Sequence, residues 1–316
     1  MPTLANGLKR GRSAVFVASR RQKEELCNGS DSGDSGSGTA WIRTGANGFP
    51  TVTPAQAERA AELLLAARGD RRPIDALPES CRPASLDDGY AVQQALVSRL
   101  AARSGDPVGF KIGATSAKAQ AFLDVPGPFS GRILAAGVSE SPASLSVGDF
   151  VFCLIEPEFA FRMAGDLPAR SAPYGEAEVA EAVAAVHPAI EVVTSAYGTA
   201  WSRAGASALV ADNGVHGAFV LGLACEGWRG LDLQAHPVRL EVNGETVGEG
   251  VGANALGGPL TALTWLANQQ SAFGRGLLAG DLVTTGVVTD FVEVASGDAV
   301  RADYGALGAL QVSFTD

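Results

Sequence analysis

The sequence has few cysteines, and they lie far apart. Only four occur among its 316 residues, at positions 27, 81, 153 and 225. No two of them have the C-x-x-C spacing of zinc or redox motifs, and none lies in a cluster with histidine. This spacing argues against a structural zinc site and against a disulfide framework. It favours reduced thiols in the cytoplasm.

Basic charge and long apolar runs are also lacking. Lysine and arginine number 24 against 34 aspartate and glutamate, which gives a formal net charge of −10. Nucleic-acid binding requires a basic surface, so nucleic acid is not an expected partner. No apolar run approaches the roughly 20 residues that span a bilayer. The run 14–18, which follows basic residues, is too short for the core of a signal peptide. We therefore expect a cytoplasmic protein without a membrane segment.

The remaining composition predicts three regions. Residues 1–50 contain the Gly, Ser and Asp-rich stretch 28–38, so we expect them to be a disordered leader and linker. Residues 51–106 carry two helix patterns and are expected to form a helical region packed on the core. Residues 107–316 are rich in strand patterns, and hydrophobic residues make up 46% of the whole chain, which is enough for a sizeable core.

Helix signals occur in four segments. Thr53 begins a capping box with proline at the first helical position, and Ser85 is a predicted helix cap with Asp88 three residues on. The predicted helices cover residues 53–69, 85–105, 175–186 and 259–274. A shorter helix is expected from Ser116 to Leu123.

Strand signals dominate after residue 106. Apolar and β-branched runs predict strands at 107–113, 149–161, 187–193, 208–213, 217–222 and 238–242. The dipeptide Asn243-Gly244 is typical of a type I′ hairpin turn. Many strands and few helices predict a mixed, β-dominated α+β domain with a rolled sheet.

Two glutamates lie within the apolar strand at 149–161. Because side chains alternate along a strand, Glu156 and Glu158 point to the same side. Buried like charges are costly unless a cation neutralises them, and oxygen ligands favour Mg²⁺, Mn²⁺ or Ca²⁺. The alternative is an edge strand with both carboxylates in water, which is common. A third carboxylate, Glu191 in the apolar run 187–193, favours a metal site with open positions for substrate and water.

Lys111 lies in the middle of the apolar run 107–113. An ammonium there must reach water or a partner, and burial lowers the pKa of a lysine until it can act as an acid or base. A structural ion pair with one of the glutamates is the alternative. His216 is a second candidate acid or base, although a lone histidine in a loop is more often structural.

Several motifs together resemble those of the 2-keto-4-pentenoate hydratase family, within the fumarylacetoacetate hydrolase superfamily. They lie at residues 109–116, 155–158, 190–191, 211–213 and 302–305, and they follow the family's order from residue 53 to residue 314. The resemblance implies a mixed β-roll of the fumarylacetoacetase C-terminal type with peripheral helices. Residues 107–316 would then be the catalytic domain.

The resemblance also implies the contents of the site. Mg²⁺ or Mn²⁺ would be held by Glu156, Glu158 and Glu191, with Lys111 in the active site. The substrate would be a small 2-oxo or 2-hydroxydienoate carboxylic acid, and the protein a homo-oligomer. We expect the substrate to be bound by Ser116, Arg132, Asn213 and Phe129.

Two positions depart from the family pattern. Relatives often have a serine after Ala-Asp-Asn, where this chain reads Gly214-Val215-His216. They also often have an acidic residue just after a proline, where this chain has Phe129.

Hydration of a 2-hydroxy-2,4-dienoate, as in aromatic meta-cleavage catabolism, is the favoured reaction. A 2-oxo-enedioate (4-oxalocrotonate-type) decarboxylase is the second possibility, with Arg132 as a candidate partner for the second carboxylate. Acylpyruvate C–C hydrolysis ranks third, because that branch commonly uses a His-Glu pair and the N-terminal region shows no clear matching histidine. A non-catalytic protein whose metal only joins strands is the remaining alternative.

Overall fold

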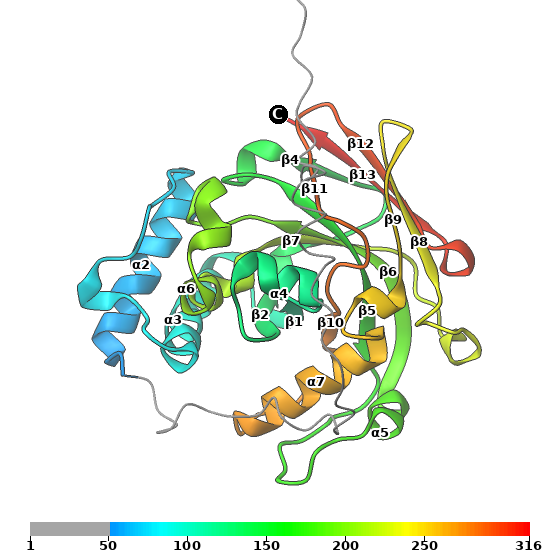
Figure 1. The fold of residues 1–316 in the computed structure, drawn as a ribbon, viewed down its shortest axis with the longest axis horizontal. Coiled ribbons are helices and arrows are strands. Elements are labelled where there is room, and N and C mark those ends of the chain that lie inside the picture. Colours follow the sequence, from blue (N-terminus) through cyan, green and yellow to red (C-terminus); the bar gives the residue numbers. More distant parts are fainter. Residues whose placement is uncertain (1–50) are drawn as a thin grey trace, which may run out of the picture. The chain divides into compact units, whose positions relative to one another are not determined.

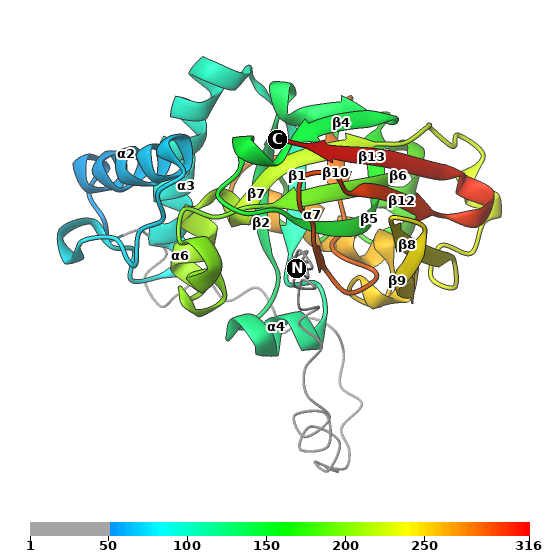
Figure 2. The ribbon, with the colours of Figure 1, turned by 90° about the horizontal axis from the view of Figure 1, so that it is seen from above.

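Two β-sheets with helices at the periphery make up the computed structural model, which describes residues 51–316 (Figure 1). The predicted leader, residues 1–50, lies outside the described residues. Helices α2, α3 and α6 lie on one side of the larger sheet, and the smaller sheet lies on the other (Figure 2). This is the α+β architecture that the sequence predicted.

The larger sheet has eight strands in the order β2-β1-β10-β5-β6-β7-β3, with β11 pairing with β5. Its strands are β1 (Pro107–Gly113), β2 (Phe129–Leu134), β3 (Val138–Glu140), β5 (Leu154–Met163), β6 (Val183–Val193), β7 (His216–Leu221), β10 (Leu282–Thr284) and β11 (Val292–Glu293). The smaller sheet has five strands in the order β4-β13-β12-β8-β9. They are β4 (Ala143–Ser146), β8 (Pro237–Val242), β9 (Glu245–Val251), β12 (Ala299–Asp303) and β13 (Ala309–Thr315).

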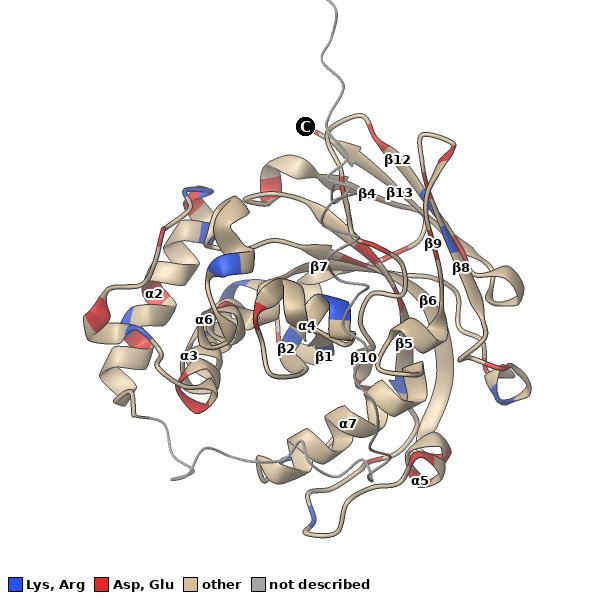
Figure 3. Ribbon diagram, viewed as in Figure 1, with Lys and Arg blue, Asp and Glu red and all other residues tan. Residues whose placement is uncertain are grey.

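The described helices are α2 (Pro54–Asp70), α3 (Leu86–Ser104), α4 (Ala117–Leu123), α5 (Glu176–Glu181), α6 (Ala206–Ala211) and α7 (Pro259–Ala272). The predicted capping box at Thr53 and the predicted cap at Ser85 are both present, and Ser85 also forms a capping box with Asp88. Within residues 51–316, no helix combines the length and the hydropathy that crossing a bilayer would require. Basic residues are scattered among acidic ones over the helices and both sheets (Figure 3).

Two predicted elements are wrong. The helix predicted over 175–186 is only the short α5, and residues from Val183 onward belong to strand β6. The strand predicted over 208–213 is instead helix α6, followed by a 3-10 turn. A short apolar run fits either element, and here packing decides. Helix α3 presents Gly89 to α6, where a Cβ atom would lie 2.6 Å from the Ser207 carbonyl oxygen.

Strand direction brings the site residues to one end of the larger sheet. Strand β1 runs parallel to β10, whereas β10–β5, β5–β6, β6–β7 and β1–β2 are antiparallel pairs. The carboxyl ends of β1, β6 and β10 therefore lie beside the amino ends of β2, β5 and β7. We call this end of the sheet the site end.

The smaller sheet supports the larger one through Tyr304, which follows β12 and is fully buried. Its hydroxyl lies 2.8 Å from the carbonyl oxygen of Glu158 and 2.7 Å from that of Ala189. These two residues pair across β5 and β6. One hydroxyl proton therefore serves two buried acceptors at the position of Glu158.

Replacing Tyr304 with phenylalanine is expected to lower the free energy of unfolding by about 1–2 kcal/mol, because a buried carbonyl loses its donor. Urea unfolding of the purified variant measures this loss. An unchanged midpoint would contradict a supporting role for the hydroxyl.

Candidate active site

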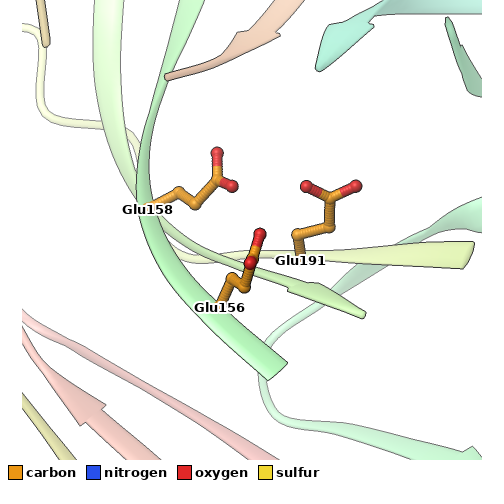
Figure 4. Close-up of side chains that lie close together, drawn as sticks. All are labelled: Glu156, Glu158 and Glu191. Carbon is orange, nitrogen blue, oxygen red and sulfur yellow. The ribbon is translucent and has the colours of Figure 1, made fainter. Parts of the chain in front are cut away.

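Three glutamates form a carboxylate cluster at the site end (Figure 4). Glu156 and Glu158 lie on the same face of β5, and Glu191 on β6 is the register partner of Glu156. One carboxylate oxygen from each residue lies within 4.8 Å of the others. The structure thus brings together the three residues that the sequence proposed as metal ligands.

The carboxylate cluster has a buried oxygen without a hydrogen-bond partner among residues 51–316, and its carboxylates repel one another. Glu158 accepts a hydrogen bond from the Gly286 N–H through Oε2 (2.7 Å), while its Oε1 is buried and has no hydrogen-bond partner among residues 51–316. Burial raises the pKa of Glu156 to about 7, with Lys111 lowering it and Glu191 raising it. Burial, followed by repulsion from Glu191 and Glu156, raises the pKa of Glu158 well above its usual range. A hard divalent cation would offset this repulsion, so the residues fit such an ion.

Lys111 faces the cluster from β1. Its Nζ lies 3.3 Å from Glu191 Oε2 and donates a hydrogen bond to the Gly214 carbonyl oxygen (3.0 Å). Burial lowers the pKa of Lys111, but Glu191, Glu156 and Glu158 outweigh it, and the pKa is raised. The expected net lowering of the Lys111 pKa is therefore wrong, because the three carboxylates outweigh the effect of burial. Lys111 is an ammonium held between carboxylates.

Three glycines surround the stem of Lys111. A Cβ atom added at Gly113 would lie 3.2 Å from the lysine Nζ, one at Gly131 3.1 Å from its Cγ, and one at Gly214 3.3 Å from its Cδ. Larger residues would have to displace the lysine or the neighbouring backbone. The three glycines therefore leave the space that the Lys111 side chain occupies beside the carboxylates.

His216, the first residue of β7, contacts the other side of Glu191. Its Nδ1 lies 2.8 Å from Glu191 Oε1, and the imidazole is buried. An ionised carboxylate only accepts hydrogen bonds, so the Nδ1–H of His216 donates to Glu191. No hydrogen-bond partner for Nε2 occurs among the described residues. His216 therefore lies against Glu191 with its second ring nitrogen unpaired among the described residues.

Two of the proposed substrate-binding residues lie at the site end. Phe129 is buried, and its ring centroid is 5.8 Å from the Lys111 Nζ. Ser116 caps α4, its hydroxyl accepting from the Ala119 N–H at 3.1 Å. The Phe129 ring thus lies beside the Lys111 ammonium, whereas the Ser116 hydroxyl already accepts a hydrogen bond as the cap of α4.

The other two do not point a free side chain at the carboxylates. The Asn213 side chain accepts from the Arg132 N–H (2.8 Å) and donates to the Arg132 carbonyl oxygen (2.9 Å). It joins β2 to the segment that enters β7. The Arg132 guanidinium stacks 3.8 Å from the ring of Phe110, on the face of the sheet opposite Lys111. The structure therefore does not bring Arg132 to the site.

Arg68, near the end of α2, was not identified from the sequence. Its Nε lies 2.6 Å from Asp212 Oδ1, and its guanidinium also donates to the backbone oxygens of Asp212 (2.7 Å) and His216 (2.7 Å). The second Asp212 oxygen accepts from the Ser195 hydroxyl (2.7 Å) and the Ala196 N–H (2.8 Å). We call this set of contacts the Arg68–Asp212 network. It fixes the turn that supplies Gly214 and His216.

Comparison with known proteins agrees with this fold. Residues 141–315 match the family model described as fumarylacetoacetate (FAA) hydrolase C-terminal, and the chain belongs to this family. It is 33% identical over 263 residues to a 2-keto-4-pentenoate hydratase of Paraburkholderia xenovorans (strain LB400), covering 83% of this chain and 96% of that protein. It is 34% identical over 257 residues to 2-keto-4-pentenoate hydratase 2 of Dechloromonas aromatica (strain RCB), covering 81% and 97%.

A solved structure confirms the predicted β-roll. The 4-oxalocrotonate decarboxylase from Pseudomonas putida G7, complexed with magnesium and adipate, superposes with a TM-score of 0.78 at 28% identity. The match covers 84% of this chain and 99% of that one.

Proposed function

We propose that this protein is a metal-dependent hydratase of the carbon–oxygen lyase class. It would add water to a 2-hydroxy-2,4-dienoate and give a 4-hydroxy-2-oxo acid, as in aromatic meta-cleavage catabolism. The carboxylate cluster beside Lys111 and His216 carries the proposal. The hydratase relatives, which align over more than four-fifths of the chain, support it.

Glu156, Glu158 and Glu191 would hold Mg²⁺ or Mn²⁺. When bound, the ion would supply Lewis-acid stabilisation of negative charge on the C2 oxygen of the substrate. The magnesium in the related decarboxylase structure supports a divalent ion. Oligomers remain our expectation for the assembled enzyme.

The reaction requires two proton movements and one water molecule. The C2 hydroxyl proton leaves, and a proton is added at C5, which gives the 2-oxo-3-enoate. Water then adds its hydroxyl at C4, and C3 gains a proton. Lys111 either pairs with the substrate carboxylate or donates the proton to C5 and recovers one from the C2 hydroxyl. His216 Nε2 accepts a proton from the attacking water, and its imidazole returns that proton to C3.

Charge favours the hydratase over a decarboxylase. A 2-oxo-enedioate carries a second carboxylate, which requires a cationic partner. Arg132 lies on the opposite face of the sheet, and Lys118 of α4 is ion-paired with Asp290. Decarboxylation stays the second candidate because a structural relative of 28% identity is a decarboxylase.

A spectrophotometric assay with 2-hydroxypenta-2,4-dienoate tests the proposal. We expect loss of the dienol absorbance, formation of 4-hydroxy-2-oxopentanoate, abolition by EDTA and recovery with Mg²⁺ or Mn²⁺. Release of CO₂ from 4-oxalocrotonate without hydration would establish the decarboxylase. Tight metal binding without turnover of either substrate would overturn both readings.

A further inference from the structure

Four aromatic side chains from separate segments meet at the site end. They are Phe122 of α4, Phe152 just before β5, Trp201 in the 3-10 helix Gly198–Arg203, and Phe291 just before β11. Ring centroids lie 5.8 Å apart for Phe122–Phe291, 6.0 Å for Phe122–Trp201, and 6.3 Å for both Phe152–Trp201 and Trp201–Phe291. We call these four residues the aromatic cluster.

Part of the aromatic cluster is open to solvent. Phe122 is 50% exposed and Phe291 is 37% exposed, whereas Trp201 is buried beneath them. Large apolar side chains rarely group on a surface unless something binds there. The position of the aromatic cluster indicates which ligand binds there.

The loop before β11 is fixed beside Glu156. Val288 donates its N–H to the Pro157 carbonyl oxygen (3.0 Å), and β11 begins by pairing with Ile155. The loop residues between these two contacts, which include Phe291, therefore flank Glu156 along β5.

Glu156 marks the accessible side of the site. Glu158, Glu191, Lys111 and His216 are all buried, whereas Glu156 is half-buried. A substrate whose carboxylate end lies at the glutamates must therefore leave its other end on the side of Glu156. That end would meet the aromatic cluster.

The segments that carry the aromatic cluster have no excess of positive charge. Their basic residues are Lys118, ion-paired with Asp290, and the exposed Arg203. Asp290 and Glu293 balance them. Such a surface suits an uncharged apolar group and gives a second carboxylate no dedicated partner.

From this arrangement we infer that the aromatic cluster is a subsite for the C5 end of the substrate. It selects dienoates that carry an aryl or alkyl group at C5 over those that carry a carboxylate there. The inference rests on the proposed hydratase function. Aromatic contacts and the burial of apolar surface provide the selectivity.

The test compares kcat/KM for 2-hydroxypenta-2,4-dienoate and for its 5-phenyl and 5-carboxy derivatives, using the full chain with Mg²⁺. We expect the phenyl compound to exceed the carboxy compound by at least about 10-fold, the scale of apolar pocket discrimination. The double variant Phe122→Ala/Phe291→Ala is expected to reduce that ratio by about 10-fold. Phe122→Leu/Phe291→Leu keeps apolar volume and should reduce it less, which guards against misfolding of the alanine variant.

Leu223→Ala is the matched control. Leu223 is 85% exposed and follows β7 at the end of the sheet opposite the site, so its loss should leave the ratio unchanged. Hydration of the unsubstituted dienoate with equal rates for both derivatives would overturn the subsite alone. Hydration of none of the three would overturn the proposed function as well. A double variant that dissociates into smaller species with an unchanged ratio would show a contact between copies instead of a subsite.

Discussion

Glu158→Gln is expected to lower kcat/KM by about 10²–10³-fold, the scale observed when a key electrostatic contact to the reacting centre is lost. Glutamine keeps the size of the side chain and an oxygen that accepts from Gly286. It removes one of the three carboxylates whose oxygens converge within 4.8 Å. Affinity for Mg²⁺ should fall with activity, because hard cations prefer charged oxygen ligands.

Titration calorimetry with Mg²⁺ in the absence of substrate separates metal binding from catalysis. Glu249→Gln, on the exposed strand β9, is the control that removes the same charge away from the site. The metal-free Glu158→Gln protein is expected to be at least as stable as the parent, because glutamine replaces a carboxylate whose ionised form is already disfavoured by burial and by repulsion from Glu191 and Glu156, which raise its pKa. Unchanged Mg²⁺ affinity would contradict the assignment of Glu158 as a ligand.

The glutamates could be proposed from the sequence because strand alternation is a local property. The spacing of Glu156 and Glu158 places them on one face of any strand that contains both. Glu191 was found because a carboxylate in an apolar run needs an explanation. That Glu191 is the register partner of Glu156 depends on how two distant strands pair, which spacing does not specify.

The position of Arg132 could not be predicted from the sequence. In the structure, Lys111 of β1 pairs with Gly131 of β2, so the next residue, Arg132, points to the opposite face of the sheet. The spacing of Lys111 and Arg132 in the sequence does not specify this register. The Asn213 amide, proposed as a substrate contact, instead joins two backbone segments. The direction of the Lys111 pKa also required the structure, because burial and attraction act in opposite senses and their balance depends on distance.

Contacts between residues far apart in the chain have no recognisable pattern in the local sequence. Gly286 binds Glu158 through a backbone N–H, which any residue but proline would supply. In the sequence, nothing distinguishes Arg68 from the other charged residues of its amphipathic helix. Its partner Asp212 lies 144 positions away, and only the folded chain brings them together.

Arg68→Ala is expected to lower the free energy of unfolding by about 3–5 kcal/mol, the cost of leaving a buried charge without its partner. Asp212 is fully buried, and its carboxylate would lose the guanidinium at 2.6 Å. The same change frees the His216 carbonyl oxygen and loosens the turn that positions Gly214 and His216. We therefore expect kcat to fall more than Mg²⁺ affinity does, since the three carboxylates stay on β5 and β6.

Urea unfolding measures the stability loss, and kcat, KM and Mg²⁺ affinity are compared at a temperature where the variant is folded. Arg59→Ala provides a control on the same helix, because Arg59 is exposed and its one ion pair within residues 51–316 is a surface pair with Glu62. Arg68→Lys keeps the charge but not the planar fork, so it should recover stability better than kcat. Pairing Arg68→Ala with Asp212→Asn should restore part of the lost stability, because the buried charge is removed together with its partner. Equal effects of Arg68→Ala and Arg59→Ala would show that the Arg68–Asp212 network does not support the site.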